Sequence, residues 1–491
     1  FKQLDSTAAR LAGLFTLSKK LDLEYTFDIS DKDNTPAFGQ YEFPATFSPV
    51  TLPDPQRAKQ GDLDGAKYEK SRSSGHAVTI NYEASQALKI KSISAYRELS
   101  FDDANDYDGT GALGFNTERH IDQDQTSQEF QFLGQAGRVN YVTGLYYFND
   151  HADTTNPFTI PTPAPLEIPH HYGVDSTSYA AFGQADVQLN QAWTVTAGAR
   201  YTTEHKEAFL QAPFAGIDVA PEKSWNNFSP MAALSYAVTS NINTYAKISR
   251  GWKAGGFNAE AGTTADAVKP YDEETLTAYE TGVKSRWLND RIQVNLAVFQ
   301  NNVDDLQVSA WDTSINASRV SNAGKARVTG AELETLFAMT EGLKGFVNYG
   351  YLDTEYLDFI DPVSGTQLRD NAKFAYSPRN KFAAGFDYMH DLNMAVLRAR
   401  VDYAFTDTQY FYYDAYSAAV TASKSYALLN ARIALSDIEV GKKGQSMELG
   451  LWGKNLTDAE YRLNGIPTST GGAVNYYGDP RTVGIDAIYN F

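Results

Sequence analysis

The sequence predicts an all-β protein, a transmembrane antiparallel up-and-down β-barrel, and three observations support this fold class. Apolar and polar residues alternate over segments of about nine to fifteen residues along the whole chain, the period of a strand with one apolar face. Short turns alternate with long polar loops between these segments. The last segment carries an apolar face that ends on a C-terminal aromatic residue, Phe491.

The composition favours strands over helices as the membrane-crossing elements. The 491 residues include 31 Tyr and 27 Phe, and the mean hydropathy is only −0.41. No stretch approaches the roughly 18–20 consecutive apolar residues that a spanning helix needs. A closed barrel also satisfies every backbone N–H and C=O in hydrocarbon, and only alternate residues of its strands face lipid. A chain of low hydropathy can therefore still cross a membrane.

The alternation assigns each strand a lipid face and a lumen face. Within 193–204, Val195 and Tyr201 fall on the apolar face, whereas Thr194 and Arg200 fall on the polar face. A soluble antiparallel sandwich would show the same alternation. Aromatic residues at the ends of the apolar faces favour the membrane barrel, because such residues form girdles at both membrane interfaces.

Pairing each segment with its neighbour across a short turn predicts about 19 strands. The long loops are expected near 31–73, 99–122, 150–174, 207–223, 253–270, 308–323, 355–375, 407–422 and 460–478. The predicted strands are 8–17, 21–30, 74–84, 87–98, 123–134, 138–149, 175–189, 192–206, 224–238, 241–251, 271–286, 291–305, 324–339, 343–354, 378–389, 392–406, 423–436, 446–457 and 479–491.

The odd strand number predicts further strands upstream. Bacterial single-chain barrels have even strand numbers, and plugged outer-membrane transporters have about 22 strands. The chain starts at Phe1 and shows no signal peptide. We therefore expect residues 1–491 to be the barrel of a processed or partial chain, with the first strands upstream.

Charge and cysteine content exclude several function classes. The net charge of −18 argues against nucleic acid as a partner, because phosphate binding needs a positive surface. Acidic loops that bind divalent cations beside lipopolysaccharide would explain this charge, and so would solubility alone. The absence of cysteine excludes disulfide scaffolds, thiol catalysis and cysteine-ligated metals.

Six strings in order along the chain carry a family resemblance. They are YAKISRGWKAGGFN at 245–258, the acidic strand and hairpin at 271–308, NAGKARVTGAE at 322–332, SPRNK at 377–381, NLTD at 455–458 and GDPRT at 478–482. Together with the terminal Phe491 they resemble the TonB-dependent outer-membrane receptor family. That family carries an N-terminal plug domain and a TonB-binding segment before its barrel, and neither is recognisable in this sequence.

The resemblance implies a transport receptor of the Gram-negative outer membrane rather than an enzyme. It would import a scarce large ligand, with a ferric siderophore as the default, energised by the TonB complex through the N-terminal region. Cobalamin, oligosaccharides and aromatic compounds remain alternative ligands. Outer-membrane lipid and lipopolysaccharide would surround the barrel. A 22-stranded barrel would be about 44 Å across, wide enough to hold a folded plug.

The candidate ligand-binding residues are aromatic and basic. A tyrosine-rich strand end and the final loop could stack on a ligand or form part of an outer aromatic girdle. Arginines on polar faces could contact an anionic ligand or pair with lumenal acids such as Glu204, Asp402 and Glu448. The candidates are Tyr410, Tyr412, Tyr413, Tyr416, Tyr476, Tyr477, Trp252, Arg200, Arg398 and Arg400.

No catalytic residue, cofactor or metal site is expected. His151, His170 and His171 share one loop, but their spacing is loose and the remaining histidines, His205 among them, stand alone in the sequence. The glycines after Trp252 lack the following helix of a phosphate-binding loop and more plausibly relieve crowding at the rim. A passive porin, an outer-membrane hydrolase and a soluble β-protein are the alternative classes.

Overall fold

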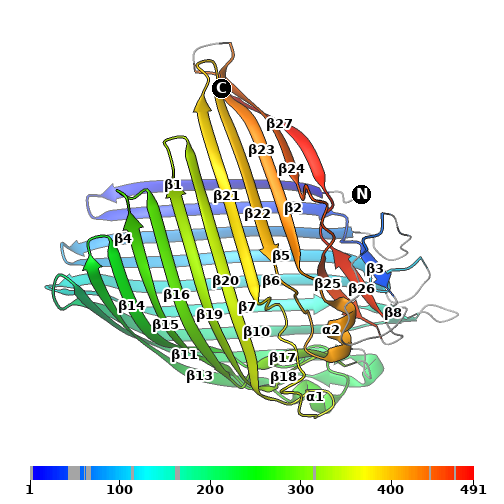
Figure 1. The fold of residues 1–491 in the computed structure, drawn as a ribbon. Helices are drawn as coiled ribbons and strands as arrows, with labels where there is room; N and C mark the ends of the chain where they lie inside the picture. Colours follow the sequence, from blue (N-terminus) through cyan, green and yellow to red (C-terminus); the bar gives the residue numbers. More distant parts are fainter. Residues whose placement is uncertain are drawn as a thin grey trace.

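The computed structural model describes residues 4–42, 56–59, 61, 68–111, 116–160, 166–312, 317–441, 444–468 and 472–491. The predicted loops at 31–73, 99–122, 150–174, 308–323 and 460–478 lie partly outside these residues. The described residues form one large antiparallel sheet that curves into a barrel wall (Figure 1).

The wall consists of 19 long strands in the described part of the chain, as the alternation predicts. They are β1 (Leu4–Ser18), β2 (Leu21–Asn34), β4 (Tyr68–Ser85), β5 (Leu88–Asp106), β6 (Asn116–Ala136), β7 (Val139–Thr155), β10 (His171–Gln188), β11 (Trp193–Ala212), β13 (Glu222–Thr239), β14 (Ile242–Lys253), β15 (Glu274–Trp287), β16 (Ile292–Asp304), β19 (Gly324–Ala338), β20 (Leu343–Phe359), β21 (Asn380–Asp391), β22 (Val396–Thr406), β23 (Tyr426–Glu439), β24 (Ser446–Lys454) and β27 (Thr482–Asn490).

Each long strand pairs with the next one along the chain, which confirms the up-and-down topology. The pairing runs without interruption from β1 to β27. Among the described residues, β1 pairs only with β2 and β27 pairs only with β24. These two edge strands are also the most exposed of the wall, with Leu4 67% and Ile485 81% exposed.

The two faces of the wall follow the predicted register. On β11, Tyr201 is 52% exposed and lies opposite Phe228 of β13, which is 57% exposed. The adjacent Arg200 stacks over the rings of Tyr146 and Phe182. Because successive side chains of a strand point to opposite faces, Tyr201 belongs to the lipid face and Arg200 to the lumen.

The connections are lopsided, as predicted. Turns such as Lys19–Lys20 and Ser240–Asn241 close one end of the barrel. The long connections emerge at the other end, where Figure 1 shows the small elements gathered. These are β3 (Gly39–Glu42), β8 (Phe158–Ile160), β9 (Leu166–Ile168), η1 (Pro213–Ala215), β12 (Ile217–Val219), α1 (Thr264–Val268), β17 (Gln307–Asp312), β18 (Ala317–Asn322), α2 (Ala415–Thr421), β25 (Arg462–Pro467) and β26 (Ala473–Tyr477).

The buried apolar clusters lie among these loops rather than between two sheets. One cluster joins Val303, Phe359 and Tyr413, and a second joins Leu210 and Ile217. A sandwich would instead bury alternate residues of every strand in a shared core. Among the described residues, no helix is long or apolar enough to cross a membrane.

Candidate functional site at the outer mouth

The outer mouth is built from loops that are far apart in the sequence. Strand β26 of the last loop pairs with β25 on one side and with β3 of the first loop on the other. Helix α2, from the connection between β22 and β23, packs beside β25 and β26. Its N-cap Asp414 accepts a hydrogen bond from the Ser417 N–H at 2.8 Å, which satisfies one backbone donor of the first turn. Three long loops therefore form one platform.

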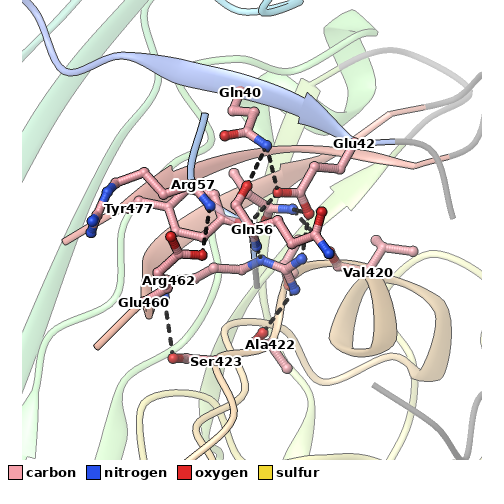
Figure 2. Close-up of polar contacts among 12 residues, drawn as sticks. Gln40, Glu42, Gln56, Arg57, Val420, Ala422, Ser423, Glu460, Arg462 and Tyr477 are labelled. Carbon is pink, nitrogen blue, oxygen red and sulfur yellow. Dashed lines mark hydrogen bonds and ion pairs between the residues drawn. The ribbon is translucent and has the colours of Figure 1, made fainter. Parts of the chain in front are cut away.

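A buried arginine joins these three loops, as Figure 2 shows. The side chain of Arg462 is 1% exposed and forms an ion pair with Glu42 of β3. Its guanidinium also donates to the Ala422 carbonyl at 3.0 Å and to the Tyr477 hydroxyl at 3.3 Å. The backbone N–H of Arg462 donates to Ser423 Oγ at 3.2 Å. A buried charge is tolerated only when it is paired and hydrogen-bonded in this way.

The same network holds a short segment of the first loop against the last one (Figure 2). The Gln40 amide donates to the Gln56 carbonyl at 2.8 Å, and the Gln56 N–H donates to the Tyr477 hydroxyl at 3.2 Å. The backbone N–H of Arg57 donates to Glu460 at 3.0 Å. Residues 56–58 are thus fixed to the platform by polar contacts, which include the Ala58 N–H donating to Gln40 Oε1 at 2.6 Å.

Three of the predicted tyrosines are structural members of the mouth. Tyr477 shares the Glu42 carboxylate with Arg462, and burial together with that carboxylate raises the pKa of Tyr477 to about 12. Tyr413 is buried and donates to Asp361 at 2.8 Å. The Tyr416 hydroxyl accepts the Gly472 N–H at 2.7 Å. These hydroxyls hold loops together.

The other predicted tyrosines present part of their surface. Tyr410 is half-buried, and the Lys373 ammonium lies 5.4 Å from its ring centroid. Tyr412 and Tyr476 are half-buried, and burial, followed by neighbours that include Tyr412, raises the pKa of Tyr476. Burial, followed by the neighbouring Tyr376 and Asp414, raises the pKa of Tyr412 to about 12. Tyr412 therefore stays a neutral hydrogen-bond donor at physiological pH.

The structure adds residues to this mouth that the sequence did not single out. Tyr107, in the loop after β5, is half-buried, and the nearby Gly109 of the same loop lies against Gly39 of β3 and Val474 of β26. Burial is the main cause that raises the pKa of Tyr107. Arg119 of β6 donates to both carboxylate oxygens of Asp103, at 3.2 and 3.1 Å. Tyr107 was missed because it stands alone in a polar loop, without the aromatic neighbours that mark 410–416.

The predicted lumenal arginines do not join the mouth. Arg200 contacts Thr202 Oγ1 at 3.1 Å. Arg398 donates to Ser436 near the short-turn end of β22, and Arg400 pairs with Asp387 at 3.4 Å and with Asp402 at 3.5 Å. These arginines are engaged by the wall itself, so the geometry separates them from the tyrosines.

Trp252 also lies apart, on the wall near the outer end of β14. The glycines that follow it relieve crowding, as predicted. A Cβ at Gly255 would stand 2.2 Å from the Tyr271 carbonyl oxygen and 2.6 Å from Trp225 Nε1. Gly256 and Tyr271 exchange backbone hydrogen bonds at 3.2 and 2.9 Å. Only glycine lets these two segments approach so closely.

The histidines of the third long loop do not form a metal site in the described part of the chain. His151 contacts Asp175 at 2.6 Å, and His171 contacts Asp153 at 3.0 Å. His170 is buried, and this burial lowers its pKa. The group that does bring three ligand atoms together contains His205 with Glu207 and Glu222. His205 is therefore not isolated in space.

A curved wall of antiparallel strands with one lipid face, and packed loops at one of its ends, is the architecture of an outer-membrane β-barrel. The family model described as "TonB dependent receptor-like, beta-barrel" matches residues 13–456. The chain belongs to this family of Gram-negative outer-membrane proteins.

Two curated relatives are receptors. The pesticin receptor of Yersinia pestis is 23% identical over 390 residues, which cover 78% of this chain and 54% of the receptor. The metal-pseudopaline receptor CntO of Pseudomonas aeruginosa is 22% identical over 345 residues, which cover 65% of this chain and 47% of CntO. The chain thus spans about half the length of the curated relatives it matches.

Two solved structures share the fold. The ferric yersiniabactin uptake receptor FyuA from Yersinia pestis superposes with a TM-score of 0.76 at 19% identity, covering 100% of this chain and 71% of FyuA. The siderophore receptor PiuA from Acinetobacter baumannii gives a TM-score of 0.78 at 14% identity, covering 99% of this chain and 74% of PiuA. At these identities the likeness establishes the fold.

Proposed function

We propose that this chain is the barrel of an active-transport receptor that imports a ferric siderophore, energised through the TonB complex. The family supports the transport mode. Similar proteins support the ligand class, because they include a ferric yersiniabactin uptake receptor and a ferric-pyoverdine receptor. On this proposal the chain performs no chemistry on its ligand.

The observation that supports the ligand class is the outer mouth, where the half-buried Tyr107, Tyr412 and Tyr476 stand in loops that pack together. Ferric chelates present oxygen-rich, anionic or aromatic surfaces. Half-buried tyrosines supply rings for stacking and neutral hydroxyl donors to such surfaces. The rigid loop platform behind them holds these groups in place.

We further propose that additional strands close the wall between β27 and β1 and that a plug domain fills the lumen. The two edge strands support the additional strands, because each pairs on one side only among the described residues, and the family supports the plug. An open edge exposes backbone donors and acceptors, which hydrocarbon does not satisfy. Three more strands would give the even number of about 22.

Ligand binding tests the first proposal directly. The detergent-solubilised chain is titrated with a panel of ferric hydroxamate and catecholate chelates, with cobalamin and with an oligosaccharide, and tryptophan fluorescence is followed. We expect a ferric chelate to bind tightest, and the double variant Tyr412→Ala/Tyr476→Ala to weaken it at least about tenfold, or 1.4 kcal/mol. The control variant Tyr388→Ala removes a tyrosine on the opposite, lipid-facing part of the wall.

If cobalamin or an oligosaccharide bound more tightly than every ferric chelate, the proposed ligand class would be wrong and that compound would take its place. An equal loss of binding in Tyr388→Ala and in the double variant would show that the mouth tyrosines do not bind the chelate specifically. Uptake by cells with and without a functional TonB complex separates active transport from the porin alternative. Uptake that is independent of TonB would identify a passive channel.

A further inference from the structure

Strands β11 and β13 bring a histidine and two glutamates to one face of the wall. His205 lies opposite Ser224, and Glu207 lies opposite Glu222. Because His205 and Glu207 are two residues apart on one strand, all four side chains project to the same side. One ligand atom from each of His205, Glu207 and Glu222 lies within 4.8 Å of the others.

The imidazole is oriented toward the carboxylates. Ser224 Oγ hydrogen-bonds His205 Nδ1 at 2.9 Å, which leaves Nε2 on the side of Glu207 at 3.3 Å and of Glu222 at 3.9 Å. Metal-binding histidines are commonly held in this manner, with one ring nitrogen bonded to a neighbour and the other presented to the ion.

The two glutamates form an unfavourable pair without a cation. Like charges directly opposite each other on antiparallel strands destabilise the sheet. The adjacent lysines do not relieve them, because Lys206 pairs with Glu204 at 3.2 Å and Lys223 pairs with Asp272 at 2.7 Å. Among the described residues no ion pair joins Glu207 or Glu222 to a lysine or arginine.

The cluster lies on the outer surface of the wall and not in the lumen. His205 follows Tyr201 by four residues, and even spacing along a strand keeps both on the lipid-side face. Tyr201 is 52% exposed, and Glu207 and Glu222 have side chains 63% and 70% exposed. The cluster therefore stands beyond the lipid-facing aromatics, separate from the tyrosine mouth.

We propose that His205, Glu207 and Glu222 form a site for a divalent transition-metal cation of the Zn²⁺ class. An imidazole nitrogen with two carboxylates is a donor set that suits zinc. Ca²⁺ and Mg²⁺ prefer all-oxygen shells, so the imidazole discriminates against them. The exposed carboxylates leave the remaining coordination positions open to water. The site is independent of the proposed uptake path.

Isothermal titration of the detergent-solubilised chain with ZnCl₂ tests this site, with excess Mg²⁺ present to occupy carboxylate-only positions. We expect one Zn²⁺ per chain in the unmodified protein, and at least about tenfold weaker binding in His205→Ala and in Glu222→Gln. The matched control is His151→Ala, which removes a histidine that pairs with the single carboxylate of Asp175 in the ion pairs of the described residues. It should bind Zn²⁺ as the unmodified protein does.

Ser224→Ala keeps all three ligands and removes only the hydrogen bond to Nδ1, so it guards against misfolding of the ligand variants. We expect it to weaken Zn²⁺ binding by about tenfold, since loss of such outer partners costs 10–100-fold. Absence of a Zn²⁺ isotherm in the unmodified chain, or equal affinity in His205→Ala and His151→Ala, would overturn the proposal. Either result leaves the ferric chelate experiment unaffected.

Discussion

Replacing the buried Arg462 by methionine should release the loop platform without unfolding the barrel wall. The guanidinium contacts Glu42, the Ala422 carbonyl and the Tyr477 hydroxyl, and its side chain is 1% exposed. Arg462→Met keeps an unbranched apolar side chain but leaves the Glu42 carboxylate without its cation. The long wall strands make none of these contacts.

The size of the effect follows from burial. Removing one partner of a buried ion pair costs about 3–5 kcal/mol. Glu42 is 22% exposed and keeps the Asn475 amide at 3.0 Å, so the lower end applies. About 3 kcal/mol corresponds to roughly a hundredfold rise in the equilibrium for local opening of β3 from β26.

Amide hydrogen exchange of residues 39–42 measures this opening, because β3 pairs with β26 through its backbone. We expect protection there to fall about a hundredfold in Arg462→Met, while the wall strands keep their protection. Arg57→Met is the control. The Arg57 side chain is 18% exposed and that of its partner Asp458 is 44% exposed, so this pair is better solvated than Arg462–Glu42 and its loss should cost less.

A fall in protection below about fivefold, or equal to that in Arg57→Met, would refute the view that the buried pair holds the platform. The double variant Glu42→Gln/Arg462→Met provides a second check. It removes both charges, so it should recover part of the lost protection, since an uncompensated buried charge is the larger cost. No recovery would mean that packing rather than charge dominates.

Three further predictions concern the wall and the loops. Leu296→Arg on the lipid face should destabilise the folded barrel by about 2–4 kcal/mol, measured by urea titration in lipid vesicles. Asn295→Arg on the lumen face should lower the free energy of unfolding much less. Equal losses of stability in the two variants would refute the assignment of lipid and lumen faces. Gly255→Ala should cost about 1–3 kcal/mol through overpacking, measured as a lower melting temperature, while Gly251→Ala, where a Cβ meets nothing within 4 Å, should not. Burial opposes ionisation of Asp361, but hydrogen bonds from neighbouring hydroxyls and N–H groups outweigh it and lower its pKa. The ionised carboxylate therefore stabilises its loop at pH values above the ordinary pKa of aspartate, and this stabilisation is lost as the pH falls through the lowered pKa. Hydrogen exchange of residues 359–368, measured against pH, should show that loss. Asp361→Asn should abolish the pH dependence of the exchange.

The wall could be predicted from the sequence because the order of apolar and polar residues within one strand depends on what its two faces contact. The alternation in 193–204 is a direct consequence of one face meeting lipid and the other meeting the lumen. The ends of the strands were predicted less accurately than their central parts. β5 continues to Asp106 and β11 to Ala212, beyond the predicted ends at 98 and 206. The outer end of β11 packs against a loop instead of facing lipid, since Leu210 is buried in a cluster with Ile217, so the strict alternation ends before the strand does.

The mouth could be predicted only in part, because its contacts join residues that are distant in the sequence. The cluster at 410–416 is visible as a run of aromatics, but whether a tyrosine faces a ligand or another loop depends on packing. Tyr413 and Tyr416 bond Asp361 and Gly472, and neither partner is marked in the sequence. The role of each tyrosine toward a ligand stays a prediction.

The buried Arg462 illustrates why the packing of the loops could not be predicted from the sequence. Its partner Glu42 is 420 residues away, and neither residue stands out in its own loop. The wall brings the first and last loops together because β1 and β27 are the two edges of one curved sheet. The same curvature that makes a lumen thus places opposite charges from both ends of the chain beside α2. On the proposal that further strands lie between β27 and β1, we expect a chain with those strands to show greater hydrogen-exchange protection of β3 and of the two edge strands.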